Sequence, residues 1–281
     1  MTSLEERHRR VGGVNVRYLI GGDGPNLVLC HGFLGSAENF ALWFDELSRR
    51  RTLIVPDLPG CGATPPLPGR HTAAALARTV HALVDDLGIE RFDLGGLCLG
   101  ASVACGLVRL CDGRVDRLVL HTPLLAPPLI NRRFRVQVRA MTTPGVFRAV
   151  HWVGTRRWVS DMYKRVMVEG DDVDPAAAEA NFTNQLRADP RATRDWLRDG
   201  LARHDIEVIT DRARPTLLLV PEHDSIANVA GLRAACANLA GVELAVIEDS
   251  GHGWTDDTVR RQLAVICAFL DAVPLPAGFA A

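Results

Sequence analysis

Lysine is almost missing from this chain of 281 residues, because Lys164 is the only lysine among 32 basic residues. Those basic residues face 33 acidic ones, and the formal net charge of −1 argues against a general binder of nucleic acid or of another polyanion. Hydrophobic residues make up 47% of the chain and charged residues 23%, which excludes a disordered or fibrous protein. We expect one α/β domain that carries an insertion.

Long hydrophobic runs are missing as well. The longest candidate, Leu118–Ile130, is interrupted by His121, Thr122 and three prolines, which excludes a membrane-spanning helix there. The charged N-terminus has no apolar stretch behind it, so we expect no secretory signal and a cytoplasmic protein. Seven cysteines without a CxxC pair indicate reduced thiols. The scattered histidines form no HxH or HExxH motif, so we expect neither a metal nor a cofactor.

Short β-branched or leucine-rich runs alternate with longer amphipathic stretches, which predicts a mostly parallel sheet with helices on both faces. A hairpin is expected across Arg10–Ile20. Strands are then expected at Asn26–His31, Thr52–Asp57, Arg91–Leu97, Val115–Thr122, Pro215–Pro221 and Val242–Glu248, with helices at Asn39–Arg50, Thr72–Gly88, Cys98–Cys111, Val229–Ala240 and Thr255–Ala272. Each strand ends in a loop rich in chemically active residues, at the edge of the sheet where ligands bind in such folds.

The alternation stops between Ala126 and Arg212, where the patterns are helical. The sequence therefore predicts a core of residues 1–125 and 213–281 with a helical lid inserted at residues 126–212. Most of the aromatic residues in the insertion are expected in its own core: Trp152, Trp158, Tyr163, Phe182 and Trp196. Because the insertion leaves the sheet at its ligand-binding edge, we expect a lid that covers the site.

The segment Gly95-Gly96-Leu97-Cys98-Leu99-Gly100 follows a hydrophobic strand and opens a helix. This is the setting of a nucleophile elbow, G-x-S-x-G, with cysteine in place of serine. Glycine is needed two residues to either side, because side chains there would collide across the tight turn. The helix N-terminus beyond it lowers a thiol pKa and offers N–H groups to a developing oxyanion. The alternative is a structural cysteine in a glycine-rich turn.

Two later strand ends supply the partners of such a nucleophile. Asp224 follows one predicted strand and His252 follows the next, so the order Cys98, Asp224, His252 is that of a hydrolase triad. Glu222 and Asp249 are rival acids.

The chain resembles lid-bearing proteins of the α/β-hydrolase fold over nearly its whole length. His31-Gly32-Phe33 resembles the oxyanion loop of that family, and the six residues from Asp57 to Gly62 resemble its Asp-x-Pro-Gly-x-Gly turn. The resemblance implies that Cys98 is the nucleophile, His252 the base and Asp224 the orienting acid. It also implies an oxyanion hole formed by the backbone N–H groups of Phe33 and Leu99, and structural roles for Asp57 and His31.

The cysteine departs from the serine found in most of the family. Thiolate leaves a tetrahedral intermediate more readily than alkoxide, so attack on an ordinary alkyl ester tends to reverse. We therefore expect a small-molecule activated acyl donor, above all a thioester, with transfer to an amine, alcohol or internal nucleophile, or to water, in secondary metabolism. The alternatives are a hydrolase of lactones or activated esters, and a non-catalytic ligand-binding protein on the same scaffold.

The predicted lid supplies one clue about partners. Five arginines and no acid lie between Ala126 and Val150: Arg132, Arg133, Arg135, Arg139 and Arg148. Such a stretch fits the acidic surface or phosphopantetheine of a carrier protein, or the phosphates of coenzyme A. The alternative is a solvated helix face balanced by Asp171, Asp172 and Asp174. Among pocket residues we expect Trp152, Trp158, Arg132 and Arg133 to contact substrate.

Overall fold

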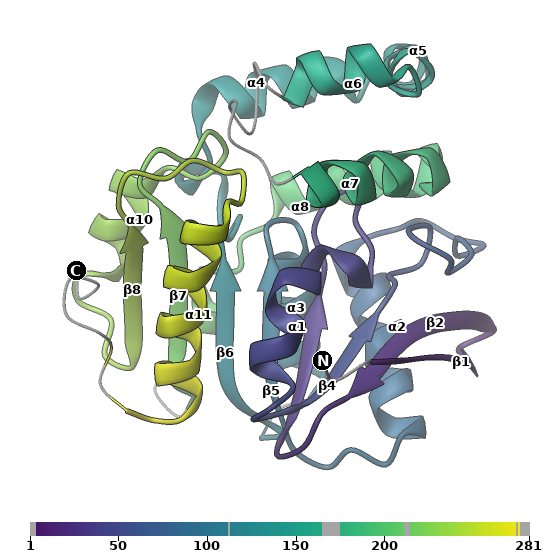
Figure 1. The fold of residues 1–281 in the computed structure, drawn as a ribbon. Coiled ribbons are helices and arrows are strands. Elements are labelled where there is room, and N and C mark those ends of the chain that lie inside the picture. Colours follow the sequence, from purple (N-terminus) through teal and green to yellow (C-terminus); the bar gives the residue numbers. More distant parts are fainter. Residues whose placement is uncertain (1–3, 112, 165–174, 211–213, 274, 276–281) are drawn as a thin grey trace.

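The protein is built on one twisted sheet of eight strands, shown in Figure 1. The computed structural model describes residues 4–111, 113–164, 175–210, 214–273 and 275. The strands are β1 (Glu5–Val11), β2 (Val14–Gly21), β3 (Asn26–Cys30), β4 (Thr52–Pro56), β5 (Phe92–Leu97), β6 (Val115–His121), β7 (Thr216–Pro221) and β8 (Val242–Ile247), in the spatial order β1-β2-β4-β3-β5-β6-β7-β8. The β1–β2 and β2–β4 pairs are antiparallel, and every other pair is parallel.

Helices cover both faces of the sheet because the central strands are apolar on both sides. Along β3, for example, Val28 and Cys30 face one hydrophobic cluster whereas Leu27 and Leu29 face the other. The first cluster is covered by α2 (Ala73–Asp86), α3 (Gly100–Leu110) and α10 (Val229–Cys236); the second is covered by α1 (Ala41–Leu47) and α11 (Asp256–Leu270). The predicted fold class, a mostly parallel sheet with helices on both faces, is confirmed.

The predicted elements are present, with most boundaries moved by one to a few residues. The hairpin begins at Glu5 rather than Arg10, because β1 exposes charged residues and lacks the apolar alternation that marks a strand. The expected helix Asn39–Arg50 is a 3-10 turn, η1 (Ala37–Phe40), followed by α1. The expected helix from Cys98 starts two residues later, because Cys98 itself has a left-handed backbone.

Between β6 and β7 the described residues are helical and contain no strand. They form η2 (Pro127–Leu129), α4 (Arg132–Met141), α5 (Pro144–Gly154), α6 (Arg157–Lys164), α7 (Pro175–Arg187), α8 (Pro190–Ala202) and α9 (Ile206–Ile209). Figure 1 shows α4 to α8 beyond the carboxyl ends of the parallel strands, with α4, α5 and α6 as the layer farthest from the sheet. None of the helices in the described part of the chain is long and apolar enough to cross a membrane.

Helix α8 is the part of the insertion that docks most firmly on the core. Its Trp196 is 1% exposed, lies edge-on to the His31 ring at 6.2 Å between centroids, and donates a 3.4 Å hydrogen bond to Ser102. The N–H group of Asp189 donates to the Gly60 carbonyl, and Asp199 accepts from the N–H group of Ala73 at the start of α2. Thus α8 braces the loops that follow β3 and β4.

The expectation that most aromatic residues of the insertion lie in a core is wrong for two of them. Trp152 is 61% exposed and Trp158 is 70% exposed, whereas Trp196 is buried and Phe182 half-buried. The side chain of Tyr163 and residues 171–174 lie outside the described residues. Helical periodicity places apolar residues on one face of a helix, but it does not say whether that face meets protein.

We predict that Trp196→Ala lowers the free energy of unfolding by about 3–5 kcal/mol, because it opens a cavity between α8 and the His31 loop. Trp158→Ala is the matched control, and at its exposed position the change should stay within about 0.5 kcal/mol. Urea unfolding of both variants measures this difference. Equal losses in the two variants would mean that α8 is not what holds the insertion to the core.

Candidate active site

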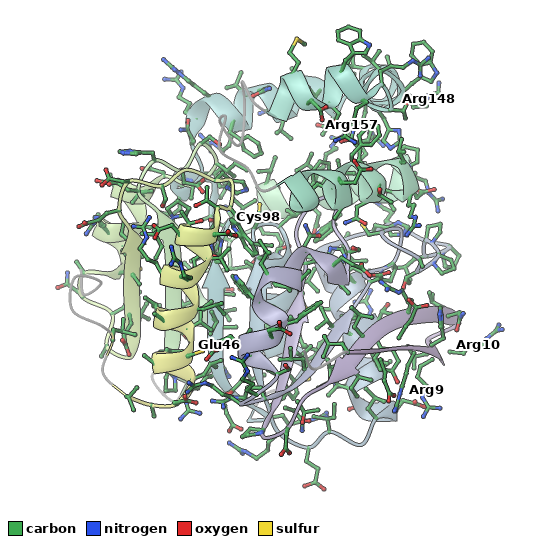
Figure 2. All side chains as sticks on the ribbon, in the orientation of Figure 1. Arg9, Arg10, Glu46, Cys98, Arg148 and Arg157 are labelled. Carbon is green, nitrogen blue, oxygen red and sulfur yellow. The ribbon has the colours of Figure 1, made fainter. Side chains whose placement is uncertain are left out.

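Cys98 lies on a sharp turn between β5 and α3. Its φ of 52° is in the left-handed region, which is costly for a residue with a side chain. Its N–H group donates to the His121 carbonyl at 2.8 Å, and its carbonyl accepts from the N–H group of Ala101 at 3.1 Å. The thiol is thus held at the carboxyl end of the sheet, next to the N-terminus of α3. In Figure 2, Cys98 lies between the strand ends and the helices of the insertion.

The two glycines around Cys98 have no room for a side chain. A Cβ atom at Gly100 would lie 2.3 Å from the carbonyl oxygens of both Cys30 and His31, and one at Gly96 would lie 2.7 Å from the Cα atom of Ala101. These contacts let the turn close tightly against β3. The tight turn at Cys98 therefore requires glycine at positions 96 and 100.

The loop after β3 lies beside the thiol. A Cβ atom at Gly32 would lie 3.4 Å from the Cβ atom of Cys98. Buried His31 holds this loop: its Nε2 accepts from the Leu58 N–H group and its Nδ1 lies 2.9 Å from the Gly32 carbonyl, so Nδ1 carries the proton. Burial lowers the pKa of His31, which keeps it neutral.

The N–H groups of Phe33 and Leu99 are expected to bind an oxyanion. Leu99 directly follows Cys98, and Phe33 follows the glycine that approaches the Cys98 side chain. Among the hydrogen bonds between described residues, none uses either of these two N–H groups. Both groups are therefore free to bind an anion that forms at Cys98.

His252 and Asp224 meet at the ends of β8 and β7. Nδ1 of His252 lies 2.8 Å from Oδ2 of Asp224, and the two side chains are 15% and 0% exposed. The other carboxylate oxygen of Asp224 accepts from the N–H groups of Ile226 and Ala227 at 2.7 and 2.6 Å. The structure thus brings Asp224 to His252, whereas the rival acids Glu222 and Asp249 bond to each other through the Asp249 N–H group.

The pKa values of Asp224 and His252 are shifted in opposite directions. Burial alone would raise the pKa of Asp224. The charge of His252 and the hydrogen bonds from His252 and from the two backbone N–H groups hold this pKa below its ordinary value. Burial alone would lower the pKa of His252, but Asp224 raises it well above 6.5, and interaction with Cys98 adds to the rise. The arrangement therefore favours an imidazolium between a carboxylate and a thiol.

Thr122 is a site residue that the sequence did not indicate. It has a φ of 49°, and its hydroxyl donates to Oδ2 of Asp224 at 3.3 Å. The ring of its neighbour His121 packs against the stacked rings of Trp43 and Trp254, and burial, with the charge of His252, lowers the pKa of His121 to about 3. The only signal in the sequence is the position of Thr122 at the end of a strand, where a β-branched residue is expected in any case.

Asp57 stabilises the turn after β4, as the resemblance implies. It is fully buried and accepts from the N–H groups of Ala37 and Ala63, both at 2.8 Å, and from Arg17 at 3.1 Å. One carboxylate therefore ties together the loops after β3 and β4 and the strand β2.

The expected pocket residues do not join this group. Trp152 on α5 and Trp158 on α6 are exposed, and so are Arg132 and Arg133 on α4. No hydrogen bond, ion pair or ring contact between described residues links any of the four to Cys98, Asp224 or His252. Their contact with substrate stays a prediction.

Three potential metal ligands do come together, although Asp249 is distant in sequence from the adjacent Glu222 and His223. One ligand atom from each of Glu222, His223 and Asp249 lies within 4.8 Å of the others. All three residues are exposed, and Glu222 already accepts the Asp249 N–H group, so we assign this cluster no chemical role.

All seven cysteines are described, and all are buried and unpaired. Burial raises the pKa of Cys30 and Cys61 to about 12 and that of Cys111 to about 11, and it also raises the pKa of Cys105, Cys236 and Cys267. Thiols that stay protonated are inert, so the six cysteines other than Cys98 are structural.

Comparison with known proteins agrees with this geometry. Residues 25–254 match the sequence profile of the alpha/beta hydrolase fold. The chain belongs to the α/β-hydrolase fold family. An uncharacterized protein of Mycobacterium tuberculosis is 28% identical to this α/β hydrolase over 282 residues, which is 94% of this chain and 80% of that protein.

Solved structures of the family share the fold. An esterase from Thermogutta terrifontis superposes with a TM-score of 0.76 at 22% identity, over 95% of this chain and 98% of the esterase. The enol-lactonase from Burkholderia xenovorans superposes with a TM-score of 0.75 at 20% identity, over 94% of this chain and all of the other. At these identities the likeness establishes the architecture of this α/β hydrolase.

We expect the His252 imidazole of this α/β hydrolase to titrate above pH 6.5, its ordinary pKa. Asp224→Asn removes the charge that raises this pKa most, so the titration should move to lower pH. NMR of the ring protons across a pH series measures both values.

The same shift makes stability depend on pH. The raised pKa stabilises the fold fully below pH 6.5, and this contribution is lost as pH rises through the folded-state value. The free energy of unfolding should therefore fall above pH 6.5 in the native protein, and fall less in Asp224→Asn. A native His252 that titrates at or below pH 6.5 would contradict the ion pair.

Proposed function

We propose that this α/β hydrolase cleaves activated carboxylic esters, such as enol esters and lactones, through an acyl-enzyme on Cys98. The observation that carries the proposal is the convergence of four strand ends, those of β3, β5, β7 and β8, which bring the Cys98 thiol, the His252–Asp224 pair and two free N–H groups together. In this proposal the thiolate of Cys98 attacks the acyl carbon, and the N–H groups of Phe33 and Leu99 stabilise the oxyanion.

Cysteine restricts the donor by its leaving-group chemistry. The tetrahedral intermediate expels either the enzyme thiolate or the alcohol part of the substrate. A simple alkoxide is the poorer leaving group, so the intermediate reverts. An enolate leaves as readily as the thiolate does, and acylation then proceeds.

His252 has two tasks in this cycle. As an imidazolium it protonates the leaving oxygen, and as the neutral base that results it deprotonates the water that attacks the acyl-enzyme. Asp224, held by Thr122 and two N–H groups, fixes the ring orientation in both states. The insertion at residues 126–212 acts as a lid over the acyl group.

The family members with similar architecture support hydrolysis. An esterase and an enol-lactonase are among them, so water is the acceptor that we favour. An intact triad disfavours a purely ligand-binding protein. All seven cysteines are free thiols, which fits the cytoplasmic location that we propose from the sequence.

A thioester donor, with transfer to an amine, an alcohol or an internal nucleophile, is the second candidate function. The cysteine itself favours it, because a thiolate leaving group matches the thiolate of Cys98 in leaving ability. A carrier protein or coenzyme A would then deliver the acyl group.

We predict that Cys98→Ala abolishes the covalent acyl adduct and lowers kcat by roughly a thousandfold or more. Intact-mass analysis during turnover of enol and thiol esters measures the adduct. The matched control is Cys267→Ala, because both cysteines are 8% exposed and Cys267 lies in α11, away from the site. Turnover that survives in Cys98→Ala would refute the assignment.

We also predict that Cys98→Ser changes the preference between donors. With an alkoxide nucleophile, the intermediate expels an alkyl alcohol as readily as the enzyme oxygen, so the ratio of enol-ester to alkyl-ester rates should fall by about tenfold or more. Initial rates with matched ester pairs give the ratio. An unchanged ratio would mean that leaving-group chemistry does not select the substrate.

A further inference from the structure

Exposed apolar side chains gather on one layer of the molecule. In the described part of the chain, ten large hydrophobic residues are exposed, and seven of them lie on α4, α5 and α6: Val136, Val146, Val150, Trp152, Val153, Trp158 and Met162. A surface patch of this kind marks an interaction site, because scattered single residues are the rule elsewhere. We call α4, α5 and α6 the outer layer.

The exposure follows the helix faces. On α5, Val146, Val150 and Val153 are spaced four and three residues apart and form one exposed stripe, whereas Phe147 is buried on a neighbouring side of the helix. On α6, Trp158 and Met162 are four residues apart and both are exposed. Both helices thus present apolar side chains to the outside, and α5 buries Phe147 as well.

The outer layer is also strongly basic. Between Asn131 and Lys164 the sequence has seven arginines and one lysine, and Asp161 is the single acidic residue. Asp161 pairs with Arg157 at 2.9 Å. No carboxylate among the described residues pairs with four exposed arginines, Arg132, Arg133, Arg139 and Arg148. Figure 2 shows Arg148 at the outer layer, far from Arg9 and Arg10 on β1.

We propose that the outer layer docks on an anionic lipid surface. Tryptophan, valine and methionine side chains enter the boundary between headgroups and acyl chains, while the surrounding arginines bind lipid phosphates. This is association with one leaflet, which needs no spanning helix. Because the outer layer lies on the same side of the sheet as Cys98, an apolar acyl substrate would reach the site from the lipid.

Charge and composition decide between a lipid surface and other partners. A second copy in a symmetric dimer would place two basic patches against each other, which is unfavourable. The charge of an acidic carrier protein would complement the arginines. Such a protein would not supply an apolar environment for the two exposed tryptophans and the valine stripe. An anionic lipid surface complements both the arginines and the exposed apolar side chains. This proposal does not depend on the chemistry proposed for Cys98.

The test is cosedimentation of the full chain with vesicles of phosphatidylcholine alone or with about one-third phosphatidylglycerol. We expect binding to the anionic vesicles, weakened by salt, and little binding to the neutral ones. The double variant Trp152→Ala/Trp158→Ala should bind at least about tenfold more weakly, because the inserted apolar area is lost.

The charge test uses a matched pair of double variants. Arg139→Ala/Arg148→Ala removes two exposed charges from the outer layer and should weaken binding roughly tenfold or more. Arg9→Ala/Arg10→Ala removes the same charge from β1 at the far end of the molecule and should bind as the native protein does. Urea unfolding of each variant establishes that it is folded.

Several results would overturn the proposal. These are no binding to either vesicle, equal binding to both, or equal losses in the two arginine variants. Sedimentation velocity that shows a dimer abolished by Trp152→Ala/Trp158→Ala would assign the outer layer to a second copy. Binding of a purified acyl carrier protein without any vesicle binding would assign it to an acidic protein.

Discussion

The left-handed turn at Cys98 is the constraint on which the site depends. It stands only because Gly96 and Gly100 let backbone approach backbone, and because β3, β5 and β6 run parallel and end together. The N–H group of Cys98 bonds to the last residue of β6, and the carbonyls at the end of β3 touch Gly100. Cys98 is thus positioned by three strands at once, and the contacts of these strands offset the strain of its backbone.

The interactions that anchor each segment become fewer with distance from this turn. The Asp224 carboxylate is fixed by four hydrogen bonds, and the His31 loop by a neutral histidine and by the edge of Trp196. Beyond α8 the insertion has few such anchors, and its apolar faces are exposed. Preorganised groups near Cys98 and a less anchored cover would suit the acyl-enzyme chemistry proposed above.

The fold could be predicted from the sequence, and so could the proximity of Asp224 and His252 in the candidate site, because each depends on local signals. Strands and helices alternate in hydrophobic pattern, and Cys98, Asp224 and His252 each follow a strand. Thr122 could not be predicted, because its role depends on a neighbouring strand distant in sequence. The exposure of Trp152 and Trp158 could not either, since periodicity identifies an apolar face but not its neighbour. Strand β1 began too late in the prediction, because both its faces are polar.

That polar strand has a consequence for how the molecule behaves in a crowded solution. β1 is the outermost strand of the sheet on one side, where unpaired N–H and C=O groups could join a strand of another molecule. Along it, exposed Glu5, Arg7 and Arg9 put opposite charges on the side chains that an approaching strand would meet. The composition of β1 therefore protects this edge of the sheet against aggregation.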